Sequence, residues 1–187
     1  MNQVFDFKRW LFLSVFLFLA GLAWGLTFSV DTPGPLAENV DALKKLSDFL
    51  APLPQISVAA FIFLKNVAAV LVGFVLSPFF CLVPVAALVL NGGLLGLVSV
   101  SVVQEKSLGY LLAGVLPHGI FELPALIIGE AAAFSFGTAV MLALVNKERR
   151  KLVLPNLKQN ARHLALAVIL LFPAALIETY VTPLLVR

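Results

Sequence analysis

Charged side chains are scarce in this sequence. They make up 12% of its 187 residues, whereas hydrophobic residues make up 61%. Because soluble domains carry about 25% charged residues, this composition excludes an ordinary soluble domain. A transmembrane β-barrel would show short segments of alternating polar and apolar residues, and no such alternation is visible. We therefore expect an all-α, polytopic helical bundle in the membrane, with residues 1–187 forming a single transmembrane domain.

Cysteine and histidine are also rare. The single cysteine, Cys81, excludes an internal disulfide, and its apolar surroundings predict a core thiol rather than a reactive one. The chain has two histidines and contains no HExxH, no GxSxG and no phosphate-binding glycine loop. We expect a protein without enzymatic activity or cofactor. The net charge of +3 comes from bases beside the apolar runs, so we expect no nucleic-acid partner.

Five apolar runs are long enough to cross a bilayer, which takes about 20 helical residues. Within the first run, Ala23-Trp24-Gly25 loosely fits a signal-peptide cleavage site. A run of about 21 residues is longer than a usual signal core, so we expect a retained span with the bilayer as its partner. The five runs cover residues 10–30, 56–77, 78–103, 107–145 and 161–181.

The fourth run is too long for one straight span. As a single helix it would measure roughly 58 Å, nearly twice the hydrocarbon thickness. The densest basic cluster follows it at residues 147–162, and the positive-inside rule places this cluster and the basic N-terminus in the cytoplasm. An even number of crossings must then separate them, so the fourth run crosses once. We expect a half-helix over 108–116, a break at Pro117 and one tilted or kinked span over 118–145, with the C-terminus extracytoplasmic.

The longest polar segment, residues 31–54, is predicted to be an extracytoplasmic loop. Apolar residues recur in it at helical spacing from Leu36 to Leu50, with charged residues between them. This pattern predicts a short amphipathic helix. Such a helix either lies on the membrane or caps the bundle, and the alternative is a face to which a partner protein docks.

One stretch of the fourth run is unlike a lipid-facing helix. Residues 116–125 contain two prolines, a glycine, a histidine and a glutamate among apolar residues. Proline removes a backbone donor and disrupts the preceding turn, and ionisable residues at membrane depth usually face a bundle interior or a watery cavity. We predict a helix break with two ionisable side chains beside it. The break residues are Pro117, Gly119 and Pro124, and the ionisable ones are His118 and Glu122.

Seven polar residues fall at similar depths in the predicted spans. A four-residue spacing puts the histidine and the first glutamate on one helix face. We expect one polar pocket that opens outward, in which the lysine faces inward and pairs with a carboxylate, and an asparagine bonds across helices. The predicted site residues are Lys65, Asn66, Asn91, His118, Glu122, Glu130 and Glu178.

The charge of this predicted pocket leaves three interpretations open. Three carboxylates and one ammonium would carry a net charge of about −2, which is too costly in a low dielectric unless protons or a cation compensate it. The residues can form structural pairs, a transport or lipid-handling site, or a metal or catalytic site on His118, Glu122 and another carboxylate. One histidine makes a poor zinc set, and His163 lies at the cytoplasmic boundary. We therefore expect no metal.

The third run contains a GxxxG match from Gly92 to Gly96, beside Asn91. Small residues at this spacing let two helices approach closely. The contact can lie within the bundle or between two copies in a homodimer, and we favour packing within the bundle.

Four groups of residues carry a resemblance to a known family. They are Phe63-Leu64-Lys65-Asn66, Asn91-Gly92 with Gly96, Pro117-His118-Gly119 with Glu122, Leu123 and Ala125, and Ala174-Ala175 with Glu178, Thr182 and Pro183. Together they resemble the stage II sporulation protein M family of integral membrane proteins. The resemblance covers residues 59–183. Lys65 departs from it, because the family pattern implies a neutral residue there, often asparagine.

The resemblance implies a small helical membrane protein without assigned catalytic chemistry. In spore-forming bacteria the namesake acts with two membrane-anchored partners, one of them a peptidoglycan-degrading enzyme, during engulfment of the forespore. Similar proteins also occur in bacteria and archaea that do not sporulate. We expect a non-enzymatic scaffold in the cell membrane that organises membrane or envelope partner proteins. The alternative is a small transporter, channel or lipid-handling protein that uses the buried polar site.

Overall fold

The computed structural model describes residues 6–28, 45 and 49–186, and throughout these residues the regular structure is helical. The expected all-α fold is confirmed: five helical segments are long and apolar enough to cross a membrane. The elements are α1 (Phe7–Gly25), α3 (Gln55–Leu76), α4 (Leu82–Glu105), α5 (Leu108–Val145), the 3₁₀ turn η2 (Lys147–Leu152), α6 (Val153–Leu176), the π-helical turn η3 (Ile177–Val181) and α7 (Thr182–Leu185).

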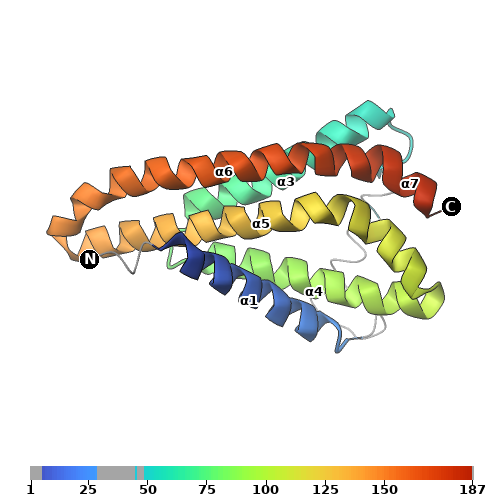
Figure 1. Ribbon diagram of the computed structural model, residues 1–187, viewed down its shortest axis with the longest axis horizontal. Coiled ribbons are helices and arrows are strands. Elements are labelled where there is room, and N and C mark those ends of the chain that lie inside the picture. The colour runs from blue at the N-terminus through green and yellow to red at the C-terminus, as the bar shows by residue number, and fades with distance from the viewer. Residues whose placement is uncertain (1–5, 29–44, 46–48, 187) are drawn as a thin grey trace.

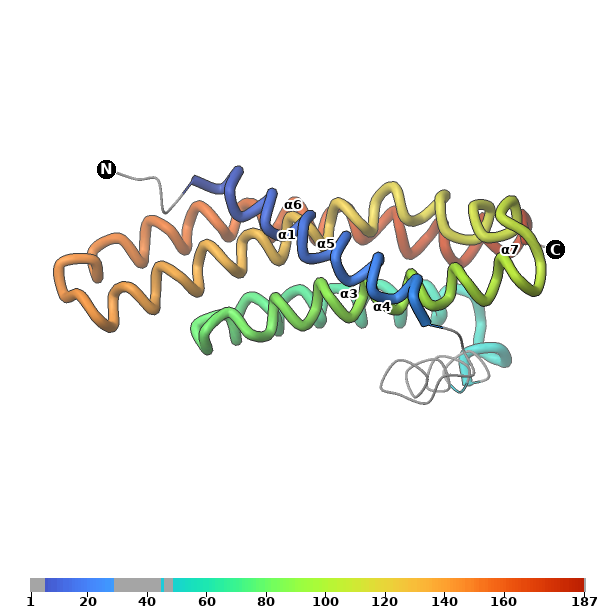
Figure 2. Tube along the Cα trace, turned by 90° about the horizontal axis from the view of Figure 1, so that it is seen from below, coloured from blue at the N-terminus to red at the C-terminus, as the bar shows by residue number. Residues whose placement is uncertain are grey.

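The helices form an elongated bundle. α5 and α6 lie side by side and antiparallel over most of their length, and α1 crosses α4 (Figures 1 and 2). The start of α1 lies toward the same end as η2, whereas α7 lies at the opposite end (Figure 1). The basic turn η2 projects beyond the ends of α3 and α4 at its side of the bundle (Figure 2).

Several predicted boundaries need correction. α1 ends at Gly25 rather than Val30, and α6 begins at Val153, eight residues before the predicted start of the last span. The third span starts at Leu82 because residues 77–81 form a turn, in which Phe80 and Cys81 have φ of 54°. The apolar runs therefore predict which stretches can cross a bilayer. They do not predict where each helix starts and ends, because local backbone geometry decides that.

The fourth segment is one continuous helix, which corrects the interruption expected at Pro117. Pro117 and Pro124 both lie inside α5, and the helix bends in its first third without ending (Figure 1). Each proline removes only its own N–H donor. In an apolar medium a full break would leave many more backbone groups unsatisfied, so a bend is the less costly response. α5 still passes from one end of the bundle to the other once.

Glycines hold α1 and α4 together. A Cβ atom at Gly21 would overlap the carbonyl oxygen of Val89, and a Cβ at Gly96 would overlap that of Leu22. Gly25 and Gly92 are equally close to the partner backbone. The expected packing of the GxxxG glycines within the bundle is confirmed, and a second glycine pair on α1 completes it. These glycines give no support to a homodimer.

A buried hydrogen-bond network links α5 to α6, and we did not predict it. The side-chain amides of Asn156 and Asn160 donate to Ser135 Oγ at 3.2 and 3.0 Å. The Asn160 amide also donates to Asn156 Oδ1 at 2.8 Å. All three residues are buried. The sequence offered one signal for this network: Asn156 and Asn160 are four residues apart near the start of an apolar run, and this spacing puts both on one helix face.

The predicted amphipathic helix from Leu36 to Leu50 lies almost entirely outside the described residues. Only Lys45, Phe49 and Leu50 of that stretch are described, and all three are in helix. The predicted extracytoplasmic loop therefore remains a prediction.

Candidate functional site

Three side chains from two elements meet at the end of the bundle that carries α7. His118 and Glu122 stand one turn apart on α5, and Glu178 comes from η3. Each offers one ligand atom, and these atoms all lie within 4.8 Å of one another. The side chains of His118 and Glu122 are 15% and 31% exposed, and Glu178 is half-buried. We call these three residues the His–Glu–Glu cluster.

Neighbouring residues orient two members of the cluster. Asn66 of α3 donates its side-chain amide to Glu122 Oε1 at 3.2 Å. His118 Nδ1 lies 3.4 Å from the hydroxyl of Thr182. These contacts leave His118 Nε2 and Glu122 Oε2 facing each other at 3.9 Å, which is too long for a hydrogen bond. The two free ligand atoms are thus held near each other without a direct bond.

The π-helical turn positions the third member. η3 continues α6 with one wider turn that carries Glu178, and the Thr179 hydroxyl bonds to the carbonyl of Ala175 at 2.8 Å. Turns of this kind are rare and occur frequently at functional sites. Here the turn presents Glu178 and, after it, Thr182 to the same segment of α5.

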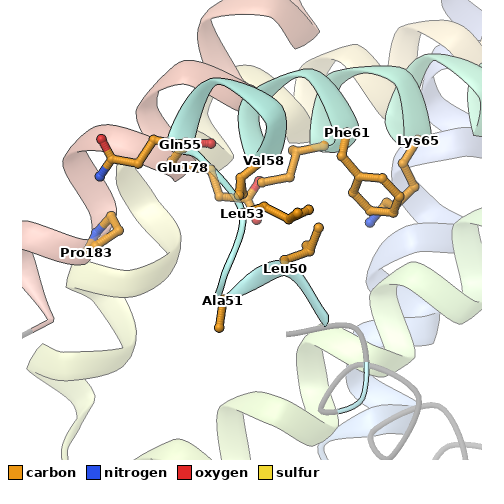
Figure 3. Close-up of a pocket in the computed structure, with 11 residues that line it drawn as sticks. Leu50, Ala51, Leu53, Gln55, Val58, Phe61, Lys65, Glu178 and Pro183 are labelled. Atoms are coloured by element: carbon orange, nitrogen blue, oxygen red, sulfur yellow. The ribbon is translucent and has the colours of Figure 1, made fainter. Parts of the chain in front are cut away.

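The cluster lies between two hollows. A cavity of about 170 Å³ is lined by His118, Glu122, Asn91 and Gly119, among others. A wider pocket of about 600 Å³ opens between α3, residues 50–53 and the chain from η3 to α7 (Figure 3). Glu178 and Lys65 supply its charged groups. Glu178 can therefore be reached from the pocket, and His118 and Glu122 have room for small ligands on the cavity side.

A family model described as Stage II sporulation protein M matches residues 14–183, which include the entire cluster. The chain belongs to the stage II sporulation protein M family. Its membership of this family and its five long apolar helices show that the chain is a membrane protein.

A curated relative from Methanocaldococcus jannaschii is 36% identical over 98 residues, and its name describes it only as an uncharacterized protein. The alignment covers 51% of this chain and 54% of that protein, so the chain spans about half of its relative's length. No solved structure matches the chain.

In this member of the family, Lys65 does not face inward as expected. It is exposed, and no described carboxylate lies within 4.0 Å of its ammonium group. The physical reason is helical geometry: successive residues are about 100° apart, and the neighbouring Asn66 is turned into the bundle, where it is 9% exposed. Lys65 instead lines the wall of the 600 Å³ pocket that also contains Glu178 (Figure 3).

Asn91 also differs from expectation. Its side-chain amide donates to the carbonyl of Ala87 on the same helix at 2.7 Å, not to another helix. A bond to the residue four positions earlier satisfies a polar side chain locally. Asn91 nevertheless lines the small cavity beside His118 and Glu122, so it belongs to the surroundings of the cluster.

Glu130 is separate from the cluster. It lies eight residues beyond Glu122 on α5, about 12 Å along the helix, and it is fully buried. Neither of its carboxyl oxygens has a hydrogen-bond partner among the described residues. The carboxyl group lies against Gly73 of α3, where an added Cβ atom would be 2.7 Å from Glu130 Oε2. A lone carboxylate is very costly in such a place, so this group is expected to be uncharged.

The second histidine lies outside the cluster, as predicted. His163 stacks on Phe7, with ring centroids 3.7 Å apart. Cys81 is half-buried in the turn before α4, 3.9 Å from the Thr138 hydroxyl. Burial raises the pKa of the Cys81 thiol above its ordinary value, which keeps it protonated and slow to react.

Proposed function

We propose that the protein is a non-enzymatic membrane scaffold that binds other membrane or envelope proteins beside Lys65. The observation that carries this proposal is an exposed lysine in the middle of a membrane span. Lys65 is the eleventh of the 22 residues of α3, so it lies about 15 Å along the helix from either end. Charged residues at this depth normally face a bundle interior, a watery cavity or an opposite charge.

The pocket beside Lys65 fits a protein partner better than bulk water. Most of its lining is apolar, including Leu53, Val58, Phe61 and Ile62. A helix that carries an acidic side chain at the depth of Lys65 would pair with the ammonium group and cover these side chains. Both effects favour association, because an ion pair gains strength in a low dielectric and the apolar walls gain packing contacts.

Replacing Lys65 with methionine should remove partner binding and leave the fold intact. Lys65 has no ion pair among the described residues, so the variant should unfold within about 1 kcal/mol of wild type. A photo-crosslinking amino acid at Ala69, an exposed position one turn further on α3, should give one defined protein adduct in native membranes. The adduct should fall at least about tenfold in Lys65→Met, a change of about 1.4 kcal/mol.

Leu64→Met is the matched control. Leu64 is the neighbouring residue on α3 and is 62% exposed, but it carries no charge, so the adduct should persist. An adduct of equal yield in Lys65→Met would rule out recognition through this lysine. An adduct between two copies of the chain would identify the partner as a second copy and make the protein a homodimer.

A transporter or lipid-handling protein is the second candidate, and the size of the pocket favours it. A space of about 600 Å³ lies within the usual range for small-ligand sites, and the Lys65 ammonium could bind a lipid phosphate. If the crosslinker at position 69 yields only lipid adducts that depend on Lys65, this function replaces the scaffold.

We also propose that the N-terminus is cytoplasmic and the C-terminus extracytoplasmic. The arrangement of the helix ends supports this, because the basic turn η2 and the start of α1 lie toward one end of the bundle and α7 at the other (Figure 1). Basic residues near span ends concentrate on the cytoplasmic side.

Single cysteines in a Cys81→Ser background test this orientation. Ser107→Cys, between α4 and α5, should react with a membrane-impermeant maleimide in intact cells. Lys147→Cys, in η2, should react only after permeabilisation, at least about tenfold faster than before it. The opposite pattern would invert the proposed topology.

A further inference from the structure

We propose that the His–Glu–Glu cluster binds one divalent first-row transition metal ion. His118 Nε2, Glu122 Oε2 and one carboxylate oxygen of Glu178 are its ligands. Glu178 also lines the pocket beside Lys65, but Lys65 is not a ligand of the ion, and metal binding by the purified protein is measured without any partner, so either proposal can fail without the other.

The separations of the ligand atoms fit a metal site that is slightly open. If three atoms lie within 4.8 Å of one another, some point lies within about 2.8 Å of all three. Zinc binds histidine nitrogen at about 2.0–2.1 Å and carboxylate oxygen at about 2.0–2.2 Å. Side-chain rotations that move each ligand atom by less than about 1 Å would close the site.

The contacts around the cluster prepare two of the ligands. A metal-bound histidine almost always donates its other ring N–H to a nearby acceptor, and ligating carboxylates are themselves hydrogen-bonded. The Thr182 hydroxyl lies 3.4 Å from His118 Nδ1, and Asn66 bonds to Glu122 Oε1. Both partners come from outside the cluster. They contact one ring nitrogen of His118 and one carboxylate oxygen of Glu122, and leave His118 Nε2 and Glu122 Oε2, which are 3.9 Å apart, for an ion.

The charges of the cluster also call for a cation. Two carboxylates and an imidazole share this space, while Lys65 is exposed and forms no ion pair with a described carboxylate. Two carboxylates inside a bundle are expensive when only a lysine beyond ion-pair distance offsets them and no proton or cation is added. A divalent ion among the three ligands would neutralise both, and the cavity of about 170 Å³ beside His118 and Glu122 has room for water to complete the coordination.

The ligand set points to a class of ion. One imidazole with two carboxylates is a poor set for a closed zinc site, but its mixed nitrogen and oxygen donors suit Mn²⁺ or Fe²⁺, and also Zn²⁺ where water completes the coordination. Mg²⁺ prefers oxygen ligands and retains several waters, so it should bind more weakly. A bound ion would fix α5 to the turn η3.

The test measures metal binding by purified protein that has first been stripped with a chelator. After equilibrium dialysis against Zn²⁺ or Mn²⁺ in excess Mg²⁺, wild type should retain one ion per chain by mass spectrometry and unfold at a higher temperature than the stripped protein. His118→Gln and Glu178→Gln each remove one ligand and should weaken binding at least about 100-fold, a larger loss than is typical of outer-shell changes.

Glu130→Gln is the matched control, because it removes a carboxylate from the same bundle but not from the cluster. It should bind the ion as wild type does. Glu178→Gln guards against misfolding, since glutamine keeps the shape of the side chain and Glu178 forms no ion pair within 4.0 Å among the described residues. Failure of wild type to bind Zn²⁺ or Mn²⁺ overturns the proposal, and so does undiminished binding by both ligand variants.

Discussion

Replacing Gly21 with alanine is expected to destabilise the bundle by about 2–3 kcal/mol, although alanine is the better helix former. The added Cβ atom would overlap the backbone of Val89 on α4, because it would lie only 2.8 Å from the Cα atom of Val89. Main-chain atoms cannot rotate away as a side chain can, so α1 and α4 must separate along their glycine contact. Overpacking of this kind costs typically about 1–3 kcal/mol. The free energy of unfolding in mixed detergent micelles measures the loss.

Gly114→Ala is the control with the same chemical change. A Cβ atom at Gly114 of α5 would meet only Val186 Cγ1, at 3.6 Å, which is ordinary contact. Without a clash, the helix propensity of alanine should leave this variant equal to wild type or about 0.5–1 kcal/mol more stable. If the two variants changed stability by the same amount, close backbone approach between α1 and α4 would not be what requires glycine.

Replacing Glu130 with methionine should stabilise the protein by about 1–3 kcal/mol. The Glu130 side chain is fully buried and its carboxyl oxygens have no partner among the described residues. A polar group buried without a hydrogen bond costs about 1–3 kcal/mol by protein mutational data, and methionine is a linear side chain that adapts to irregular core space. The same micelle unfolding measurement reports the gain.

Glu130→Gln separates polarity from charge. Glutamine keeps the shape and two polar atoms, so its stability should remain close to that of wild type if the carboxyl group is uncharged. A loss of about 3 kcal/mol or more in either variant would mean that the carboxylate is ionised and paired. Glu130 would then hold a bound water or ion that balances it. If Glu130→Met is more stable than wild type, the Glu130 carboxyl group lowers the stability of the native fold.

Position along each helix could be predicted well from the sequence, but direction around each helix could not. Lys65 and Asn66 share a depth, yet one is exposed and the other is turned into the bundle. In a soluble helix the polar face marks the outside. In this chain the lipid-facing and core-facing sides are both apolar, so the pattern carries little information on which side faces in. The prediction that Lys65 faces inward was wrong because the sequence does not show which side of α3 faces the bundle.

The candidate site shows the same division. The four-residue spacing of His118 and Glu122 predicted that they lie close together, because residues at this spacing share one face of a helix. Glu178 reaches them through the packing of η3 against α5, whereas Glu130 is held about 12 Å further along α5 beside Gly73. Both glutamates looked alike in the sequence. Only the contacts of α5 with its neighbours separate the residue that joins the cluster from the one that does not.

The sequence by itself determined the all-α membrane fold, its five long apolar helices and the family, because these depend on the length of apolar runs and on local motifs. The tertiary structure alone decided that α5 bends without a break, that glycines on α1 and α4 meet, and that Asn66 and Thr182 orient the cluster. These features depend on how helices rotate and pack against each other. That choice is made by contacts between residues far apart in the chain, which no local pattern records.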